Sequence, residues 1–277
     1  PWLGTTLITA GIYNRFASEE LKKSVLNRVA EGAALAISMS EPGAGSDVAA
    51  ITCRAERTSD GWVINGQKTW CTNAHAADSI LLVARTARGE KKHHGLTMFH
   101  VPRDTHGLAI KGIDTMNGPE VNDLYFTDCV LPEDAVIGEV DAGWKQLMAG
   151  LDTERLILAA HMLGIAERAF DECLTFVTER TQFGQKVGSF QALKHRLADL
   201  ATEIECARLL VYSVAAQADD PNRTRSLTRE SSMAKLKSTE VARSMAVEGM
   251  QMMGGYGYST EFDMVHHVRM ALGATIY

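Results

Sequence analysis

Glu154 is the acidic residue whose position in the sequence most suggests chemistry. On a helical period it falls in a stripe of otherwise apolar side chains: Leu147, Leu151, Leu158, Met162, Ile165 and Ala169. We therefore expect its carboxylate to be largely buried. An unpaired buried carboxylate costs on the order of several kcal/mol, so it must be ion-paired, protonated or functional. An ion pair with Arg155 or a neighbouring helix is the structural alternative, and Glu172 falls on the same stripe, so spacing alone identifies no base.

The stretch from Glu41 to Asp47, EPGAGSD, has the composition of a tight turn with exposed backbone N–H groups. The hydroxyls of Ser38, Ser40 and Ser46 flank it, so it suits an anion or the polar edge of a ligand. An ordinary turn between two strands explains the same residues.

A flat apolar side chain stands beside a hydroxyl in the run Trp70, Cys71, Thr72. Residues two apart on a strand point to the same face, so Trp70 and Thr72 would form one wall. Such a wall suits a planar heterocycle. A core tryptophan beside a hydrogen-bonded threonine is the structural alternative.

Two predicted helix ends carry groups that suit a nucleotide. Arg180 closes one long helix and Gln191 enters the next, and an arginine fixed at a helix end can clamp phosphate oxygens. The same arginine would complement the helix dipole without any ligand. Gln251 to Gly255 places an amide and two glycines at another helix end, where an ordinary C-cap is the alternative.

The composition is that of a globular protein whose partner is a small molecule or another protein. The chain has 277 residues, 45% of them hydrophobic, and a formal net charge of -6, which argues against a nucleic-acid surface. No apolar run approaches the roughly 20 residues that span a bilayer, so no membrane partner is expected. The five cysteines form no CxxC pair, which suggests reduced thiols. The pairs His93–His94 and His266–His267 lack the spacing of a metal site, so no metal is expected, and GxSxG and P-loop motifs are absent.

Three successive regions must position these groups. Residues 1–34 have helical spacing, residues 35–138 alternate in short segments, and residues 139–277 contain long helical patterns. Strands are expected at residues 51–57, 62–64, 79–84, 96–101, 108–113 and 123–129, with hairpin turns at Asp60–Gly61 and Asn65–Gly66. Helices are expected at residues 143–180, from an N-cap at Ser189 to 218, at 226–253, and from just after Thr260 onward, still running at Tyr277.

The fold class is therefore α+β and multidomain. It combines a helical N-terminal remnant, a central β-barrel or sandwich and a C-terminal antiparallel four-helix bundle. Both the first and the last helical patterns look cut, so a larger helical unit and the end of the bundle are expected to lie outside this sequence.

Taken in order, five motifs resemble the acyl-CoA dehydrogenase family. They are ISMSEPGAGSD at 37–47, NGQKTWCTN at 65–73, GLDTERLILAA at 150–160, ERTQFGQ at 179–185 and QMMGGYGY at 251–258. The resemblance covers essentially the whole chain. It implies an N-terminal helical domain, a β domain and a C-terminal four-helix bundle with FAD between them, usually in a homotetramer.

The resemblance also implies roles for individual residues. The flavin ring would be lined by Ile37, Ser38, Met39, Ser40, Ser46, Trp70, Cys71 and Thr72. The FAD pyrophosphate and adenosine of a neighbouring subunit would meet Arg180, Gln191, Gln251, Met252, Met253, Gly254 and Gly255. The acyl-CoA substrate would contact Ser46, Asp152, Thr153, Glu154 and Arg155.

The catalytic base differs among members of this family. Most place a glutamate in a Tyr-Glu-Gly run, which would be the position after Tyr277, whereas the isovaleryl and long-chain types place it in the first bundle helix. The run Leu151 to Arg155 matches the second kind, so Glu154 is the expected base. It would remove the α-proton of an acyl-CoA while the β-hydrogen leaves as hydride to flavin N5.

The expected product is the trans-2-enoyl-CoA, with an electron-transferring flavoprotein as the acceptor of the electrons. Two alternatives remain: an acyl-CoA oxidase, and a catalytically silent FAD-binding subunit of a hetero-oligomer. A bacterial cytoplasm and a mitochondrial matrix both suit the composition, and we favour the cytoplasm.

Overall fold

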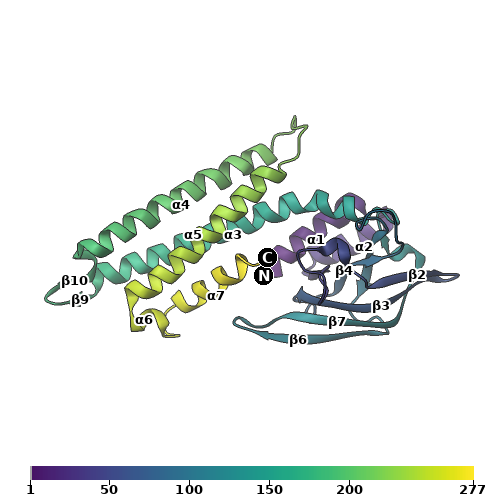
Figure 1. Ribbon diagram of the computed structural model, residues 1–277, viewed down its shortest axis with the longest axis horizontal. Coiled ribbons are helices and arrows are strands. Elements are labelled where there is room, and N and C mark those ends of the chain that lie inside the picture. The colour runs from purple at the N-terminus through teal and green to yellow at the C-terminus, as the bar shows by residue number, and fades with distance from the viewer. Residues whose placement is uncertain (1) are drawn as a thin grey trace. The chain divides into compact units, whose positions relative to one another are not determined.

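The computed structural model describes residues 2–277 and divides the chain into two compact units, Pro1–Gly150 and Leu151–Tyr277 (Figure 1). The long helix α3 (Gly143–Glu179) contributes residues to both units. No helix among the described residues combines the length and apolar character that crossing a membrane requires.

The first unit begins with two helices, α1 (Trp2–Phe16) and α2 (Glu19–Ala30). Ser18 caps α2, because its hydroxyl accepts a hydrogen bond from the backbone N–H of Leu21 at 3.3 Å. Ile12, Tyr13 and Val25 are buried and belong to one hydrophobic cluster with strand residues. Two helices therefore occupy most of the span in which helical spacing was expected, at residues 2–16 and 19–30.

An eight-stranded mixed sheet follows. Its strands are β1 (Leu35–Ser38), β2 (Arg54–Thr58), β3 (Gly61–Thr72), β4 (Ser79–Arg85), β5 (Leu96–Pro102), β6 (Leu108–Thr115), β7 (Gly118–Leu131) and β8 (Val136–Ile137). The order is β6-β7-β3-β2-β4-β5-β8, and β1 pairs with β4 in parallel. Two short 3-10 turns, Val48–Ala50 and Glu133–Ala135, interrupt the connections.

The central strand β4 is buried on both faces. Ile80, Leu82 and Ala84 pack into one cluster, made of strand residues, while Leu81 and Val83 pack into the cluster that contains α1 and α2. Successive side chains of a strand point to opposite faces, so a continuous apolar run is what such a strand requires.

One predicted hairpin is wrong. Asp60–Gly61 does join β2 to β3, since Thr58 pairs with Gly61. Asn65–Gly66, however, lies inside the 12-residue strand β3, at a register irregularity in its pairing with β7. Gly66 has φ 147°, and a Cβ there would lie 2.7 Å from Cys53 Cα, so this glycine permits a close approach of two strands instead of a turn. The strands expected from the sequence also did not include the short strand β1, although the turn considered at 41–47 would follow a strand.

The second unit is a helical bundle. After α3 come a small hairpin of β9 (Thr181–Gln182) and β10 (Gln185–Lys186), a 3-10 turn (Val187–Ser189), α4 (Gln191–Ala218), α5 (Thr228–Met253), α6 (Gly255–Tyr258) and α7 (Met264–Ala274). Buried apolar residues of α3, α4, α5 and α7 form one continuous core. The predicted arrangement of a β domain and a helical bundle is confirmed.

Two predicted helix ends in this unit are wrong. Ser189 does not cap α4: it belongs to the 3-10 turn, its hydroxyl donates to the carbonyl of Lys186 at 2.6 Å, and Phe190 is the N-cap. The last helix ends at Ala274 and does not continue to Tyr277. Gly254 ends α5 with φ 62°, as its position predicted.

Candidate active site

Glu154 lies in the second unit on α3, close to the buried stripe of this helix. Its side chain is partly buried, and its Oε2 atom is buried without a hydrogen-bond partner among the described residues. Burial raises the pKa of this carboxyl above its ordinary value, although the positive charges of Arg155 and Lys235 oppose the shift. A carboxylate in this state is a stronger base than one in water.

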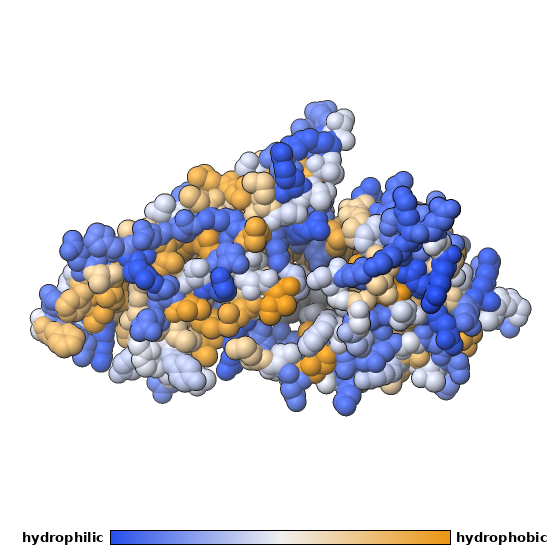
Figure 2. Space-filling model, viewed as in Figure 1, coloured by the Kyte–Doolittle hydropathy of each residue, from blue (hydrophilic) through white to orange (hydrophobic). Residues whose placement is uncertain are grey.

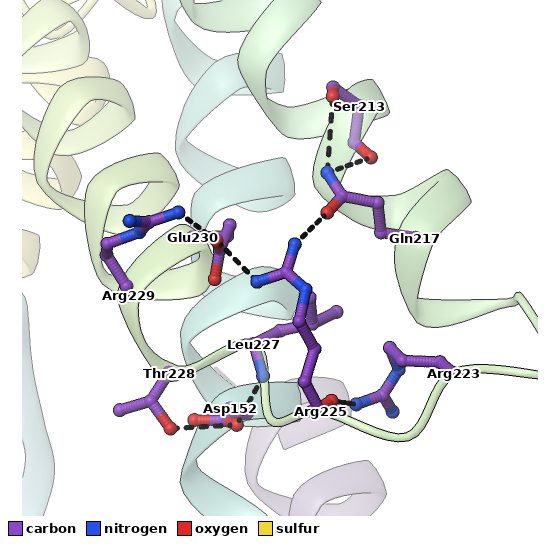
Figure 3. A network of polar contacts seen from close by, with 9 residues as sticks. All are labelled: Asp152, Ser213, Gln217, Arg223, Arg225, Leu227, Thr228, Arg229 and Glu230. Carbon is purple, nitrogen blue, oxygen red and sulfur yellow. Dashed lines mark hydrogen bonds and ion pairs between the residues drawn. The ribbon is translucent and has the colours of Figure 1, made fainter.

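Asp152 connects α3 to the start of α5. Its Oδ2 atom accepts hydrogen bonds from the backbone N–H of Leu227 at 3.2 Å and from the hydroxyl of Thr228 at 3.1 Å (Figure 3). Its other oxygen lies 3.5 Å from a guanidinium nitrogen of Arg155. Asp152 thus fixes the helix turn that carries Glu154 against the first turn of α5.

A charged network organises the turn between α4 and α5 just beyond this contact (Figure 3). Glu230 accepts from Arg225 and from Arg229, both at 2.8 Å, and Arg225 also donates to Gln217 at 2.9 Å. The hydrogen bond from Arg225, together with that from Arg229, lowers the pKa of Glu230 to about 2. The Glu230 carboxylate therefore stays ionised at ordinary pH.

Lys235 lies on α5, and its positive charge acts on Glu154. Its ammonium donates to the carbonyl of Tyr277 and lies 6.0 Å from the centre of the Tyr277 ring. Burial lowers the pKa of Lys235, and the charges of Arg155 and Glu154 act on it in opposite directions. Sequence reasoning missed this lysine, because only the packing of α5 on α3 brings it near the proposed base.

Trp70 interrupts the regular geometry of β3 in the first unit. The pairing with β7 shifts register between Lys68 and Cys71, and Trp70 adopts φ 59°. A bulky residue in this left-handed region is a conformational outlier that surrounding structure must hold in place. The result is an indole that is 60% exposed, two residues before the partly buried Thr72.

Neighbouring strands hold this irregular stretch. On the β7 side, the Thr69 hydroxyl donates to Asp123 at 2.6 Å, and the side chain of Asn122 donates to the carbonyl of Cys71 at 2.9 Å. On the β1 side, Cys71 Sγ contacts the carbonyl of Ile37 at 3.2 Å. The structure therefore brings the two predicted flavin-contacting stretches, 37–40 and 70–72, together within one unit.

Ser46 is predicted to contact both the flavin and the substrate. It is exposed and lies in the loop that leads from β1 to the 3-10 turn. Thr153, the other predicted substrate contact, is exposed on α3.

The predicted nucleotide-contacting residues gather at one end of the bundle. Arg180 follows the last residue of α3, and its guanidinium lies 5.1 Å from the ring centre of Tyr256. Tyr256 lies in α6 and directly follows the predicted set, in which Gln251, Met252 and Met253 end α5, Gly254 is the C-cap and Gly255 begins α6. Gln191 is the first residue of α4. Phe183, at the tip of the β9–β10 hairpin, is 92% exposed.

No group of three or more His, Cys, Asp and Glu side chains among the described residues could hold a metal ion. The chemistry that these sites offer is that of a desolvated carboxylate, an exposed indole beside hydroxyls, and an arginine at a helix end.

Two family models match the chain. The acyl-CoA dehydrogenase middle domain matches residues 36–129, and the acyl-CoA dehydrogenase C-terminal domain matches residues 141–277. The chain belongs to the acyl-CoA dehydrogenase family. It is a flavin-dependent acyl-CoA dehydrogenase, as its matches to named relatives also indicate.

Two relatives illustrate the range of similar acyl-CoA dehydrogenases. A probable acyl-CoA dehydrogenase, FadE25 of Mycobacterium tuberculosis, is 36% identical over 277 residues, which cover 97% of this chain and 69% of the relative. The mitochondrial isovaleryl-CoA dehydrogenase of Solanum tuberosum is 35% identical over 263 residues, which cover 93% of this chain and 62% of that protein.

Three solved structures illustrate that this chain shares its fold with known proteins. Butyryl-CoA dehydrogenase from Megasphaera elsdenii is 33% identical with a TM-score of 0.93, covering 100% of this chain and 73% of that one. A structure described as the electron transferring flavoprotein of Acidaminococcus fermentans is 33% identical with a TM-score of 0.94. The match covers 100% of this chain and 73% of that one. A structure described as the FAD complex of PigA is 27% identical with a TM-score of 0.93, and the match covers 100% of this chain and 72% of that one.

Proposed function

We propose that this protein catalyses the FAD-dependent α,β-dehydrogenation of an acyl-CoA thioester to the trans-2-enoyl-CoA, with Glu154 as the base. The observation that carries the proposal is the buried, unpartnered Oε2 atom of Glu154 in a chain of the acyl-CoA dehydrogenase family. A carboxylate oxygen without an internal partner is free to accept a proton from a substrate.

The chemistry required of Glu154 is removal of a weakly acidic α-proton. Burial makes its carboxylate more basic, and the family position of the base in isovaleryl-type enzymes supports the choice of this residue. Hydrogen bonds to the thioester carbonyl would stabilise the negative charge that develops there. Asp152, Thr153 and Arg155 on the same helix turn, with Ser46 of the β unit, are the proposed substrate contacts.

The residues of the β unit fit a flavin. An exposed indole held in a left-handed backbone offers a flat wall, and the hydroxyls of Ser40 and Thr72 offer polar contacts for a heterocycle's edge. Ile37, Ser38, Met39 and Cys71 complete the proposed lining. FAD bound there would supply the acceptor for the β-hydrogen.

We further propose that the functional form is a homotetramer whose subunits share FAD. Arg180, Gln191 and the residues from Gln251 to Gly255 would contact the pyrophosphate and adenosine of a neighbour's cofactor. The 92% exposed Phe183 beside this group supports a contact with another subunit. Hydrophobic residues also gather on the visible surface of the helical unit (Figure 2), and Leu209 and Tyr212 of α4 are 64% and 68% exposed.

An electron-transferring flavoprotein is the proposed electron acceptor. The similarity to the structure described as the electron transferring flavoprotein of Acidaminococcus fermentans supports a link between this fold and such carriers. The five cysteines carry free thiols, which supports a reducing compartment, and we propose the bacterial cytoplasm.

The proposal can be examined by anaerobic bleaching of bound flavin with a panel of acyl-CoAs of different chain length and branching. We expect the Glu154→Gln variant to retain FAD but to bleach more slowly by a factor of about 10² to 10⁴, the usual contribution of a positioned base. The acyl-CoA that bleaches the unmodified protein fastest identifies the preferred substrate.

Glu167→Gln is the matched control, because it makes the same chemical change on α3 at a residue that is ion-paired with Arg208 at 2.9 Å. Equal bleaching by the Glu154→Gln variant and the control would remove Glu154 from the mechanism. Binding of FAD without reduction by any acyl-CoA would favour a silent subunit, and steady peroxide formation in air without an added acceptor would favour an oxidase.

A further inference from the structure

The segment that follows β1 is held to β3 through its backbone carbonyls. The Lys68 ammonium donates to the carbonyl of Met39 at 2.8 Å, and the backbone N–H of Thr69 donates to the carbonyl of Ser40 at 2.9 Å. Within the described part of the chain, no hydrogen-bond acceptor pairs with the backbone N–H groups of Met39 and Ser40. The carbonyls face β3, so these two donors are left for another group.

Lys68 is an unusual residue to find at such a contact. Its side chain is 0% exposed, and it sits two residues before Trp70, at the start of the bulge in β3. Its charge is balanced by Glu41, whose Oε1 atom lies 2.9 Å from the ammonium. A buried lysine requires such compensation, because a charge removed from water without a partner is strongly destabilising.

Glu41 is itself held by the segment that leads into β2. Its Oε2 atom accepts from the backbone N–H of Thr52 at 2.7 Å and from the Thr52 hydroxyl at 2.9 Å, and its Oε1 atom accepts from the N–H of Cys53 at 2.8 Å. Burial alone would raise the pKa of Glu41, but Lys68 and these N–H groups outweigh it and hold the pKa below its usual range. The lowered pKa therefore favours the ionised carboxylate, which is the partner that the Lys68 ammonium requires.

We propose that the buried Lys68–Glu41 pair is the device that positions the flavin-contacting backbone of Met39 and Ser40. Lys68 is a positioning residue: it acts through the Met39 carbonyl, and Glu41 fixes the ammonium in place. The inference rests on the proposed function, because it assumes that segment 37–40 contacts FAD.

The alternative is a pair that only stabilises the β unit. Replacing a buried ion pair by apolar residues is often neutral for stability, so burial of this pair is weak support for a purely structural role. The direct hydrogen bond from Lys68 to the Met39 carbonyl favours the positioning role. It holds the peptide group of the proposed flavin segment in one orientation relative to the buried ion pair.

The test compares Lys68→Met with Lys68→Arg and with a control, Leu131→Ala, in the full chain. Leu131 is buried in the same unit but pairs with Trp62, at the other end of β3 from Trp70. FAD dissociation constants, visible absorption spectra and midpoint potentials of the bound flavin are measured, together with unfolding by urea. We expect FAD affinity to fall about tenfold or more in Lys68→Met, with an altered flavin spectrum and partial recovery in Lys68→Arg, since charged hydrogen bonds are the strong ones.

The control should unfold at lower urea concentration yet keep its FAD affinity within about twofold, because its cavity lies outside the segment. If Lys68→Met does not fold, Glu41→Gln/Lys68→Met removes both charges, and we expect that variant to fold but still to bind FAD weakly. Unchanged FAD affinity and flavin spectrum in a folded Lys68→Met or double variant would overturn the inference while leaving the proposed function intact. Failure of the unmodified protein to bind FAD or to be bleached by any acyl-CoA would overturn both.

Discussion

At the scale of single residues, Glu154 is set apart by the balance of charges around it. Desolvation makes its carboxyl a weaker acid, whereas Arg155 and Lys235 favour the ionised form. The net effect is a raised pKa, so the ionised carboxylate gains basicity. This balance gives Lys235 a tuning effect on the base from a neighbouring helix.

The raised pKa of Glu154 predicts the acid side of the pH–rate profile. A base must be deprotonated to act, so activity should fall as the pH drops through the raised pKa of Glu154, which lies above the ordinary 4.5 of a glutamate. We expect Lys235→Met to move this limb to still higher pH, because it removes a positive charge that lowers the pKa. The measurement is the pH dependence of the flavin reduction rate. An acid limb that does not move in Lys235→Met would contradict this assignment.

Some residues of the candidate site could be predicted from the sequence and others could not. Glu154 and Trp70 could be selected because each stands in a short motif with a readable period. The buried pair of Lys68 and Glu41 could not, because its members are 27 positions apart and meet only when β3 lies beside the segment after β1. The left-handed conformation of Trp70 also has no signal in the sequence, because residues of this size rarely adopt it.

At the scale of elements, long periodic patterns were predictable and local exceptions were not. The spans of α3 and α5 follow from apolar residues at helical spacing, and β4 follows from a continuous apolar run between polar residues. Asn65–Gly66 was misread because the same dipeptide that forms hairpins also permits a bulge in a long strand. Which of the two forms depends on the strand that pairs across it.

Helix α1 and strand β5 are joined by a buried polar contact that predicts a pH dependence of stability. The Tyr13 hydroxyl lies 2.7 Å from His100 Nδ1, and burial, with a smaller effect of Arg28, lowers the pKa of His100 to about 4. The folded state thus favours neutral His100. The contribution of neutral His100 to the free energy of unfolding should be fully present above pH 6.5, the ordinary pKa of histidine. It should be lost as the pH falls from there towards about 4.

Urea unfolding midpoints measured at several pH values across this window check the prediction. His100→Gln, which cannot be protonated, should show a shallower decline in stability than the unmodified protein. Equal declines in the two proteins would mean that other groups cause the loss.

At the scale of the whole molecule, the helical unit exposes large apolar side chains, among them Leu209 and Tyr212. Leu209 and Tyr212 lie three residues apart on α4, so they point to the same side of the helix. In the proposed homotetramer this side would be covered by a second copy of the chain. The exposed apolar surface and the proposed sharing of FAD thus call for the same assembly.

We expect Leu209→Asp to shift the protein to smaller species in analytical ultracentrifugation, because a charge placed in an apolar interface cannot be solvated there. Flavin content should fall with the loss of assembly, while circular dichroism should show an unchanged helix content. An unaltered sedimentation profile would place the subunit contacts elsewhere.

The bulge at Trp70 also gives the protein an optical property. Of its four tryptophans, Trp62 is 3% exposed in the sheet core, whereas Trp70 is 60% exposed on the sheet surface. The fluorescence of the buried Trp62 is shielded from the solvent, whereas the fluorescence of the exposed Trp70 changes when another group covers its ring. The bulge in β3 that exposes this indole therefore makes Trp70 a natural fluorescent reporter of the surface on which it lies.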